Sequence, residues 1–99
     1  MLNLDNIINQ SEEVCIFGER IHVKQPTIRM VMDIKKIEED LDQTNILEKR
    51  LDVALVLLNN NSENRKYTRE ELMELPRVAV EALVVKISEV NVEADQNPN

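Results

Sequence analysis

The sequence is poor in several residue types, and each shortage excludes a class of protein. Its single cysteine, Cys15, cannot form an internal disulfide, and its single glycine, Gly18, excludes glycine-rich nucleotide-binding loops. With Phe17 and Tyr67 as the only aromatic residues, any core must be aliphatic. No apolar run approaches the roughly 18 residues that a membrane-spanning helix requires. The first five residues lack the basic start of a secretory signal, so we expect an intracellular protein without a membrane partner.

The net charge of the chain also limits the partners that we expect. The 99 residues carry 12 Lys and Arg against 19 Asp and Glu, which gives a net charge of −7. Nucleic-acid binding depends on cations that neutralise phosphates, so this balance argues against a nucleic-acid partner. Positive charge is nevertheless concentrated in residues 20–36, which keeps a small nucleic-acid-associated regulator as an alternative. The cationic positions of this stretch are Arg20, His22, Lys24, Arg29, Lys35 and Lys36.

Residues 13–24 are predicted to form a β-hairpin. In its second arm Ile21 and Val23 alternate with polar residues, a period of two that is typical of a half-buried strand. Gly18 lies between the arms, where a tight turn needs a residue that tolerates positive φ. Because an isolated two-stranded hairpin is only marginally stable in water, these strands must pack on helices or join the sheet of another subunit.

Most of the remaining chain is predicted to be helical. Residues 3–10 can form a short amphipathic helical turn. A longer helix is expected over residues 27–41, where apolar residues recur with a helical period. The next helix should start near residues 42–45 and contain the apolar run 53–58. Residues 59–64 then end that helix as a polar loop.

The C-terminal third contains the clearest local signal for a helix start. Thr68 and Glu71 have the spacing of a capping box. Pro76 must then either kink this helix or separate a short turn from a new helix. The fold is therefore predicted to be mainly α, with three to four helices and the N-terminal hairpin. A single domain should span residues 1–92, followed by a disordered polar tail over residues 93–99.

The sequence contains no recognisable catalytic or metal site, so we expect neither enzymatic activity nor a cofactor. Cys15 and His22 can approach each other across a hairpin. Without a cleft or oxyanion donors, however, the pair is better explained as a strand-face histidine beside a small buried thiol. Zinc sites usually need four Cys or His ligands, and the acidic residues 38–42 lack the spacing of a calcium-binding loop.

The most informative remaining feature is an excess of apolar residues. Residues 53–58 and 78–87 are apolar on nearly all sides, which is typical of buried helices. One such segment fits the centre of a small domain, so the other should cover part of its surface with another subunit or a client chain. The alternative is that the two segments pack only on each other. The expected client-binding residues are Val53, Leu57, Val80, Leu83, Val84 and Ile87, and the expected subunit contacts are Leu4, Ile7, Ile21 and Val23.

A resemblance to a known family lies in residues 16–29, which read IFGERIHVKQPTIR. This segment is similar to the N-terminal hairpin and following helix of tail assembly chaperones from siphophages, particularly those that infect lactic-acid bacteria. The resemblance implies a non-enzymatic protein of the host cytoplasm, absent from the mature virion, that coats the tape measure protein and helps recruit tail tube subunits. Because a tape measure helix is very long, many copies must bind, which favours a homo-oligomer. A virion connector protein, which would remain in mature particles, is another interpretation.

Overall fold

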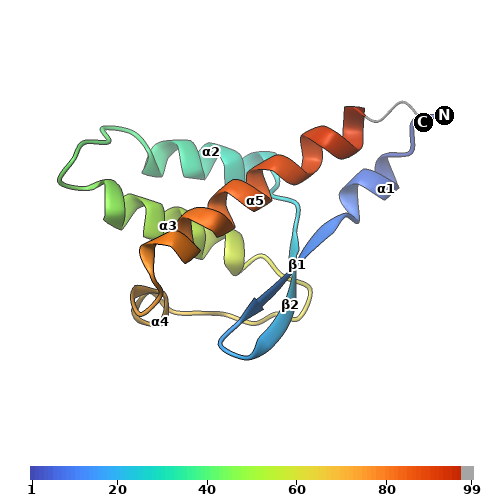
Figure 1. Cartoon of the computed structure of the whole chain (residues 1–99). Helices are drawn as coiled ribbons and strands as arrows, with labels where there is room; N and C mark the ends of the chain where they lie inside the picture. Colours follow the sequence, from blue (N-terminus) through green and yellow to red (C-terminus); the bar gives the residue numbers. More distant parts are fainter. Residues whose placement is uncertain (97–99) are drawn as a thin grey trace.

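Five helices and one β-hairpin make up the part of the chain that the structure describes (Figure 1). The computed structural model covers the backbone of residues 1–96 and the side chains of residues 1–88. In chain order the elements are α1 (Leu4–Ile8), β1 (Ser11–Ile16), β2 (Glu19–Lys24), α2 (Ile28–Ile37), α3 (Ile46–Leu58), α4 (Arg69–Met73) and α5 (Arg77–Gln96). The predominance of helix and the N-terminal hairpin are confirmed. The described residues form five helices rather than three to four, because α1 and α4 are separate helices of 5 residues each.

The hairpin closes through a two-residue turn. Phe17 and Gly18 both have positive φ, 52° and 79°, which is the geometry that tight hairpin turns require. The strands pair antiparallel from Ile16 opposite Glu19 to Ser11 opposite Lys24, so β1 begins at Ser11 rather than near residue 13. In this register the side chains of Ile21 and Val23 point into the core, as their alternation predicts.

The loop after α3 continues the sheet on the free side of β2. Asn61 forms an isolated antiparallel bridge with Val23. The N–H of Lys24 donates to the carbonyl of Asn60 at 2.8 Å, and the N–H of Ser62 donates to the carbonyl of His22 at 3.0 Å. The outer edge of β2 is therefore covered by residues that belong to a polar loop in the sequence.

Helix α2 begins where the sequence predicts and ends early. The side chain of Thr27 caps it by accepting a hydrogen bond from a backbone N–H at 3.1 Å. The helix ends at Ile37 rather than near residue 41. Asp40 has a φ of 58°, a left-handed conformation that an α-helix cannot continue. Asp42 then accepts a hydrogen bond from the N–H of Thr44 at 2.8 Å, which fixes the turn before α3.

Helix α3 is the central element, because it contacts α2, α4, α5 and strand β2. It ends at Leu58, as its apolar run predicts. Its contribution to the core consists of Val53, Ala54, Leu57 and Leu58. The other buried apolar residues, from the hairpin, α4, α5 and the loop before α4, are Ile16, Ile21, Val23, Tyr67, Leu72, Val80, Val84 and Ile87.

The capping box is confirmed, and it starts α4. The N–H of Thr68 donates to the carboxylate of Glu71 at 2.9 Å, and the N–H of Glu71 donates to the hydroxyl of Thr68 at 3.2 Å. Pro76 separates α4 from α5, because its missing N–H prevents a continuous helix. Helix α5 continues to Gln96, so the first residues of the predicted tail are helical, and 97–99 lie outside the described residues.

The short helix α1 lies beside the far end of α5 (Figure 1). Asn3 caps it, because its side chain accepts a hydrogen bond from the N–H of Asn6. Within residues 1–96, no helix combines the length and the apolar character that crossing a membrane requires.

Candidate docking surface

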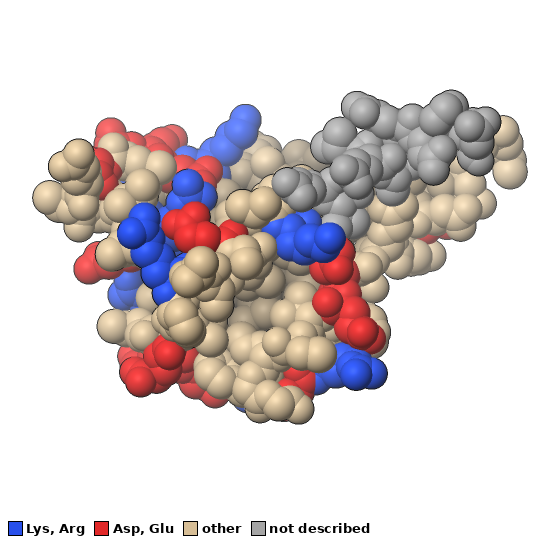
Figure 2. Space-filling view, viewed as in Figure 1, with Lys and Arg blue, Asp and Glu red and all other residues tan. Residues whose placement is uncertain are grey.

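Over residues 77–88, helix α5 has one apolar face that is covered and a second apolar face that is exposed. Its inner face buries Val80, Val84 and Ile87 against the core. On its opposite side Val78 is 76% exposed and Val85 is 51% exposed, with the exposed Ala82 between them. We call these three residues the outer stripe. Figure 2 shows a broad uncharged area on the face that α5 crosses, with charged side chains at its edges.

The spacing of the outer stripe is that of a helix-pairing seam. Val78, Ala82 and Val85 are separated by four and then three residues, the alternation that repeats in coiled coils. Their side chains are short, and valine is held in few rotamers on a helix, so another helix can approach closely at a small cost in side-chain entropy. The outer stripe therefore has the shape and the chemistry of a surface for a second helix.

A groove lies beside the start of α5. It is a cavity of about 340 Å³ between α3, α4 and α5. Two of its apolar residues are largely exposed, Leu47 at 56% and Met73 at 62%. The full lining is Leu47, Glu48, Arg50, Leu51, Arg69, Leu72, Met73, Leu75, Arg77, Val80 and Glu81. We call it the arginine-rimmed groove, because three arginines belong to its lining.

The three arginines differ in how well their charge is matched. Arg69 Nε lies 3.1 Å from a carboxylate oxygen of Asp52. Arg77 Nε is 4.0 Å from Glu81, and its side chain is 73% exposed, so this pair is weak. The Nε atom of Arg50 is buried and has no hydrogen-bond partner among the described residues. The groove thus combines apolar walls with three arginines, and the carboxylates of Glu48, Glu81 and Asp52 match them in number.

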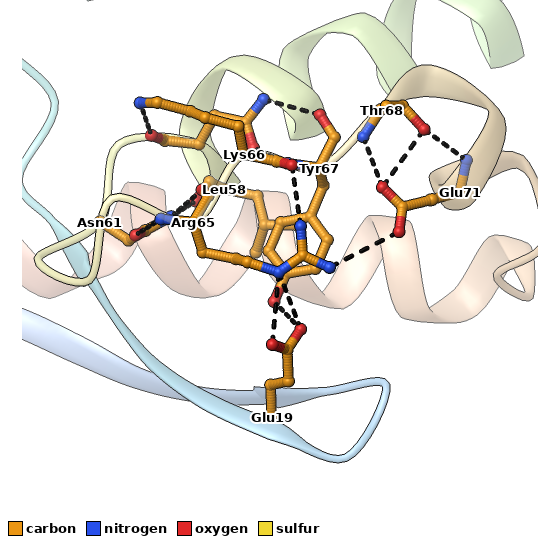
Figure 3. Close-up of polar contacts among 9 residues, drawn as sticks. Glu19, Leu58, Asn61, Arg65, Lys66, Tyr67, Thr68 and Glu71 are labelled. Atoms are coloured by element: carbon orange, nitrogen blue, oxygen red, sulfur yellow. Dashed lines mark hydrogen bonds and ion pairs between the residues drawn. The ribbon is translucent and has the colours of Figure 1, made fainter.

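A network of polar contacts holds α4 against the hairpin and so shapes one wall of the groove (Figure 3). Arg65 lies over the ring of Tyr67, with its guanidinium carbon 4.2 Å from the ring centroid. Its Nε is 3.0 Å from Glu19, and another guanidinium nitrogen is 3.6 Å from Glu71, the capping residue of α4. The hydroxyl of Tyr67 donates to Glu19 at 3.1 Å. Burial, reinforced by this carboxylate, raises the pKa of Tyr67 above its ordinary value, so the hydroxyl remains a donor.

A second exposed apolar surface lies on α2. None of the residues of α2 is buried. Its apolar residues Ile28, Val31 and Met32 are 81%, 41% and 57% exposed. A second cavity of about 290 Å³ runs beneath this helix. Its lining is Pro26, Val31, Ile34, Lys35, Glu38, Val53, Leu57, Val84, Ile87 and Ser88. Helix α2 therefore covers the core with one side only and leaves apolar residues in contact with solvent.

The structure places the residues that the sequence suggested for client binding in or beside the core. Five are buried, with exposures of 2% to 8%: Val53, Leu57, Val80, Val84 and Ile87. Leu83 is partly buried and packs against them. While the domain remains folded, the five buried side chains are not exposed to a client. An apolar run indicates that a helix is buried, but the run does not tell which of its faces the rest of the chain covers.

The four residues expected to contact another subunit fall into a buried pair and a more exposed pair. Ile21 and Val23 are 2% and 1% exposed, so they belong to the core of this chain. Leu4 is 59% exposed and Ile7 is half-buried on α1. The hairpin packs on the helices, which is one of the two arrangements that its marginal stability required.

The two candidate reactive residues do not face each other. Cys15 lies opposite Arg20, whereas His22 lies opposite Glu13. Cys15 is exposed, so the expected buried thiol is corrected: its side chain is on the solvent face of β1. His22 Nδ1 instead lies 2.7 Å from Glu63. Over residues 1–88, no group of three His, Cys, Asp or Glu side chains is arranged to hold a metal ion.

Sequence reasoning missed the outer stripe and the groove. The stripe could have been found, because Val78, Ala82 and Val85 follow a coiled-coil spacing within a helix that also contains a second apolar period. The groove could not, because Leu47 and Met73 come from helices that are separated by the whole of the intervening loop. Comparisons of the chain with models of protein families, with curated proteins and with solved structures gave no match.

Proposed function

We propose that this chain is a non-enzymatic helix-binding protein that keeps an apolar helical client in solution. The observation that carries the proposal is the outer stripe of α5, because Val78, Ala82 and Val85 present an exposed seam at coiled-coil spacing. An amphipathic client helix that covers this seam would remove apolar surface from water on both partners. In this proposal the client binds on the opposite side of α5 from the residues that form the core.

The dimensions of the stripe favour many copies on one client. Three residues spaced over two helical turns cover about 10 Å of a partner helix, at a rise of about 1.5 Å per residue. A long client therefore requires a row of subunits, and a homo-oligomer brings them together. The exposed residues Ile28, Val31 and Met32 of α2 provide a second apolar surface, which we assign to contacts between copies of this chain.

The resemblance of residues 16–29 to siphophage tail assembly chaperones suggests the identity of the client. A tape measure protein is a long apolar helical rod, which is the type of partner that the outer stripe fits. In this proposal the chain acts in the host cytoplasm, assists the addition of tail tube subunits and is absent from the mature virion. A virion connector would instead remain in mature particles, so protein analysis of purified virions separates the two.

The nucleic-acid alternative receives less support from the geometry of residues 20–36. Arg20 lies 3.9 Å from Glu13, and His22 lies 3.5 Å from the same carboxylate and 2.7 Å from Glu63. These carboxylates reduce the positive potential that phosphate binding needs. Association with duplex DNA that weakens steeply with salt would favour this alternative over helix binding.

The proposal is tested by co-expression with a siphophage tape measure protein, the client that the resemblance suggests. Without a functional partner that client should be insoluble, and the wild-type chain should raise its soluble fraction. Val85→Asp places a charge in the outer stripe and should abolish this effect. Ala79→Asp adds the same charge at an exposed position of α5 outside the stripe and should behave as wild type. Full client solubility with Val85→Asp would overturn the proposal.

A further inference from the structure

Residues 2–8 form an apolar arm that lies open to solvent. Every residue of α1 is exposed or half-buried. The side chains of Leu2, Leu4 and Ile8 are 71%, 59% and 65% exposed. Leu4 and Ile8 are four residues apart, so they lie on the same side of α1. We call residues 2–8 the arm, and a second surface that covered its apolar side chains would remove them from water.

The arm carries less charge than the other exposed apolar surfaces. Asp5 is the one charged side chain among its seven residues. Helix α2 contains four charged residues in ten, and residues 77–88, which include the outer stripe, contain three in twelve. The surface that fits the arm should therefore be apolar and have little net charge of its own.

The arginine-rimmed groove has these properties. Its volume of about 340 Å³ is at the small end of the range for ligand sites, so it suits a few apolar side chains and not a whole helix. Leu47 and Met73 belong to its lining and are 56% and 62% exposed. Its three arginines are matched in number by Glu48, Glu81 and Asp52. A groove with matched charges offers little attraction to a strongly charged segment of either sign.

The structure holds the arm away from the groove of its own chain. Figure 1 shows α1 beside the far end of α5, whereas Arg77 and Glu81 of the groove lie at the start of that helix. The 20 residues of α5 span about 30 Å. Only Asn9 and Gln10 connect α1 to β1, and the side chain of Gln10 accepts a hydrogen bond from Gln25 at 2.9 Å. The arm that fills a groove therefore comes from another copy of the chain.

We propose that the arm of one copy docks in the arginine-rimmed groove of a second copy, where the side chains of Leu4 and Ile8 enter the apolar space. The arm and the groove lie at opposite ends of α5, so each copy offers one surface to each of two neighbours. Such head-to-tail contacts build a ring or a row of subunits. The inference deepens the proposed function, because it gives the row on a long client a defined contact, but the contact itself needs no client.

The test detects the contact between two copies by NMR. One copy carries Asn6→Cys with a nitroxide spin label, and its native cysteine is replaced by serine. Asn6 is exposed and lies two residues from both Leu4 and Ile8, on the other side of α1, so the label leaves the docking side free. The other copy is isotope-labelled, so only its amides are observed. At about 0.5 mM of each copy, about a quarter of the observed chain is bound even if Kd is about 1 mM, and the amide signals of Leu47 and Met73 should weaken at least about twofold relative to the sample with reduced label.

Two matched pairs of variants locate the contact. In the spin-labelled copy Leu4→Asp places a charge in the arm and should abolish the signal loss, whereas Asn9→Asp, at an exposed position after α1, should preserve it. In the observed copy Leu47→Asp should abolish the loss at Met73, whereas Gln43→Asp, at an exposed position outside the groove, should preserve it. Leu4 and Leu47 are more than half exposed and lie in first turns of helices, where an acidic side chain is favourable. Each variant should therefore fold, and the amide spectrum of the same sample verifies it.

Several results would overturn the inference. Signal loss at no amide would show that the arm does not dock, and loss centred on α2 or on the outer stripe would place the arm on another surface. A loss at Met73 that survives Leu47→Asp would reflect non-specific collision. Shifts at Met73 on addition of an amphipathic leucine-rich peptide, without any loss caused by the spin-labelled copy, would assign the groove to the helical client instead. Because the samples of the two copies contain no client, a negative result here leaves the test of the outer stripe unaffected.

Discussion

Asn61 and Val23 form an isolated antiparallel bridge that fastens the loop after α3 to the hairpin. Asn61 is 2% exposed, and its side chain is fully engaged. Its amide nitrogen donates to the carbonyls of Leu58 at 2.8 Å and Arg65 at 2.7 Å, and its amide oxygen accepts from the N–H of Arg65 at 2.8 Å. The loop is thus held by one buried side chain on one side and by strand β2 on the other.

Replacement of this side chain should destabilise the fold. Asn61→Ala leaves the N–H and carbonyl of Arg65 and the carbonyl of Leu58 without their partner, so the free energy of unfolding should fall by about 2–3 kcal/mol. Urea denaturation followed by circular dichroism measures this loss. The neighbouring Ser62→Ala, at an exposed position, should change stability by less than about 0.5 kcal/mol. Equal stability of the two variants would contradict a structural role for Asn61.

Gly18 should be required for its backbone conformation and not for space. A Cβ at this position would meet no atom within 4 Å, but φ is +79°. Gly18→Ala should therefore cost about 1–2 kcal/mol of stability through backbone strain alone. Gly18→Asn should cost less, because asparagine tolerates this conformation better. Thermal unfolding of the two variants tests the order, and a more stable alanine variant would disprove it.

The adjacent residues Val84 and Val85 provide a matched test of which face of α5 is covered. Val84 is 8% exposed and Val85 is 51% exposed. Val84→Asp buries an unpaired charge and should reduce the free energy of unfolding by at least about 3 kcal/mol. Val85→Asp should change it by less than about 0.5 kcal/mol. Similar losses in both variants would mean that both faces of the helix are buried.

The contact between His22 and Glu63 should depend on pH. The hydrogen bond to Glu63 raises the pKa of His22 above its ordinary value of 6.5, and the same bond lowers the pKa of Glu63 below 4.5. The histidine contribution to stability is complete below pH 6.5 and is lost as the pH rises through the raised pKa of His22. The glutamate contribution is complete above pH 4.5 and is lost as the pH falls through the lowered pKa of Glu63. The contact between His22 and Glu63 should therefore stabilise the fold most between pH 4.5 and pH 6.5.

An NMR titration of the His22 ring measures this coupling directly. In the wild-type chain the pKa should lie above 6.5, and Glu63→Gln should move it toward that value. Glu13→Gln should have a smaller effect, because Glu13 lies farther from the ring, at 3.5 Å rather than 2.7 Å. An unchanged titration in Glu63→Gln would show that another group sets the pKa.

The two edges of the hairpin should differ in hydrogen exchange. Since the turn closes at the Ile16–Glu19 pair, the backbone groups of Glu13 and Cys15 point away from β2. Their N–H groups have no backbone partner among the described residues. On the other edge the N–H of His22 donates to the Glu63 carboxylate at 2.9 Å and that of Lys24 to Asn60 at 2.8 Å.

Amides of His22 and Lys24 should therefore exchange at least about tenfold more slowly than those of Glu13 and Cys15. Two-dimensional NMR in deuterated buffer measures the four rates in one sample. The neighbouring amide of Val14, which faces β2 within the hairpin, serves as an internal control and should be protected. Equal protection on both edges would indicate that a further strand covers β1, for example from a second copy of the chain.

Local signals in the sequence predicted several elements correctly. Thr68 and Glu71 bond within one helical turn, so no distant residue is needed to start α4. Gly18 fixed the position of the hairpin turn in the same way. The end of α2 was wrong, because the apolar pattern continues to Leu41 while the conformation of Asp40 stops the helix. The three consecutive asparagines after α3 suggested only a polar loop, although Asn61 is one of the most buried residues in the chain.

Local signals in the sequence predict most of the helices and strands and an aliphatic core. Those properties follow from turn chemistry, capping and periodicity, which act over a few residues. Packing between distant elements sets that α5 buries Val84 and exposes Val85, and that Leu47 and Met73 line one groove. Which face of a helix is covered depends on elements from distant parts of the chain that pack against it. The helical period of the apolar residues does not identify that face, because the period is the same whichever face is covered.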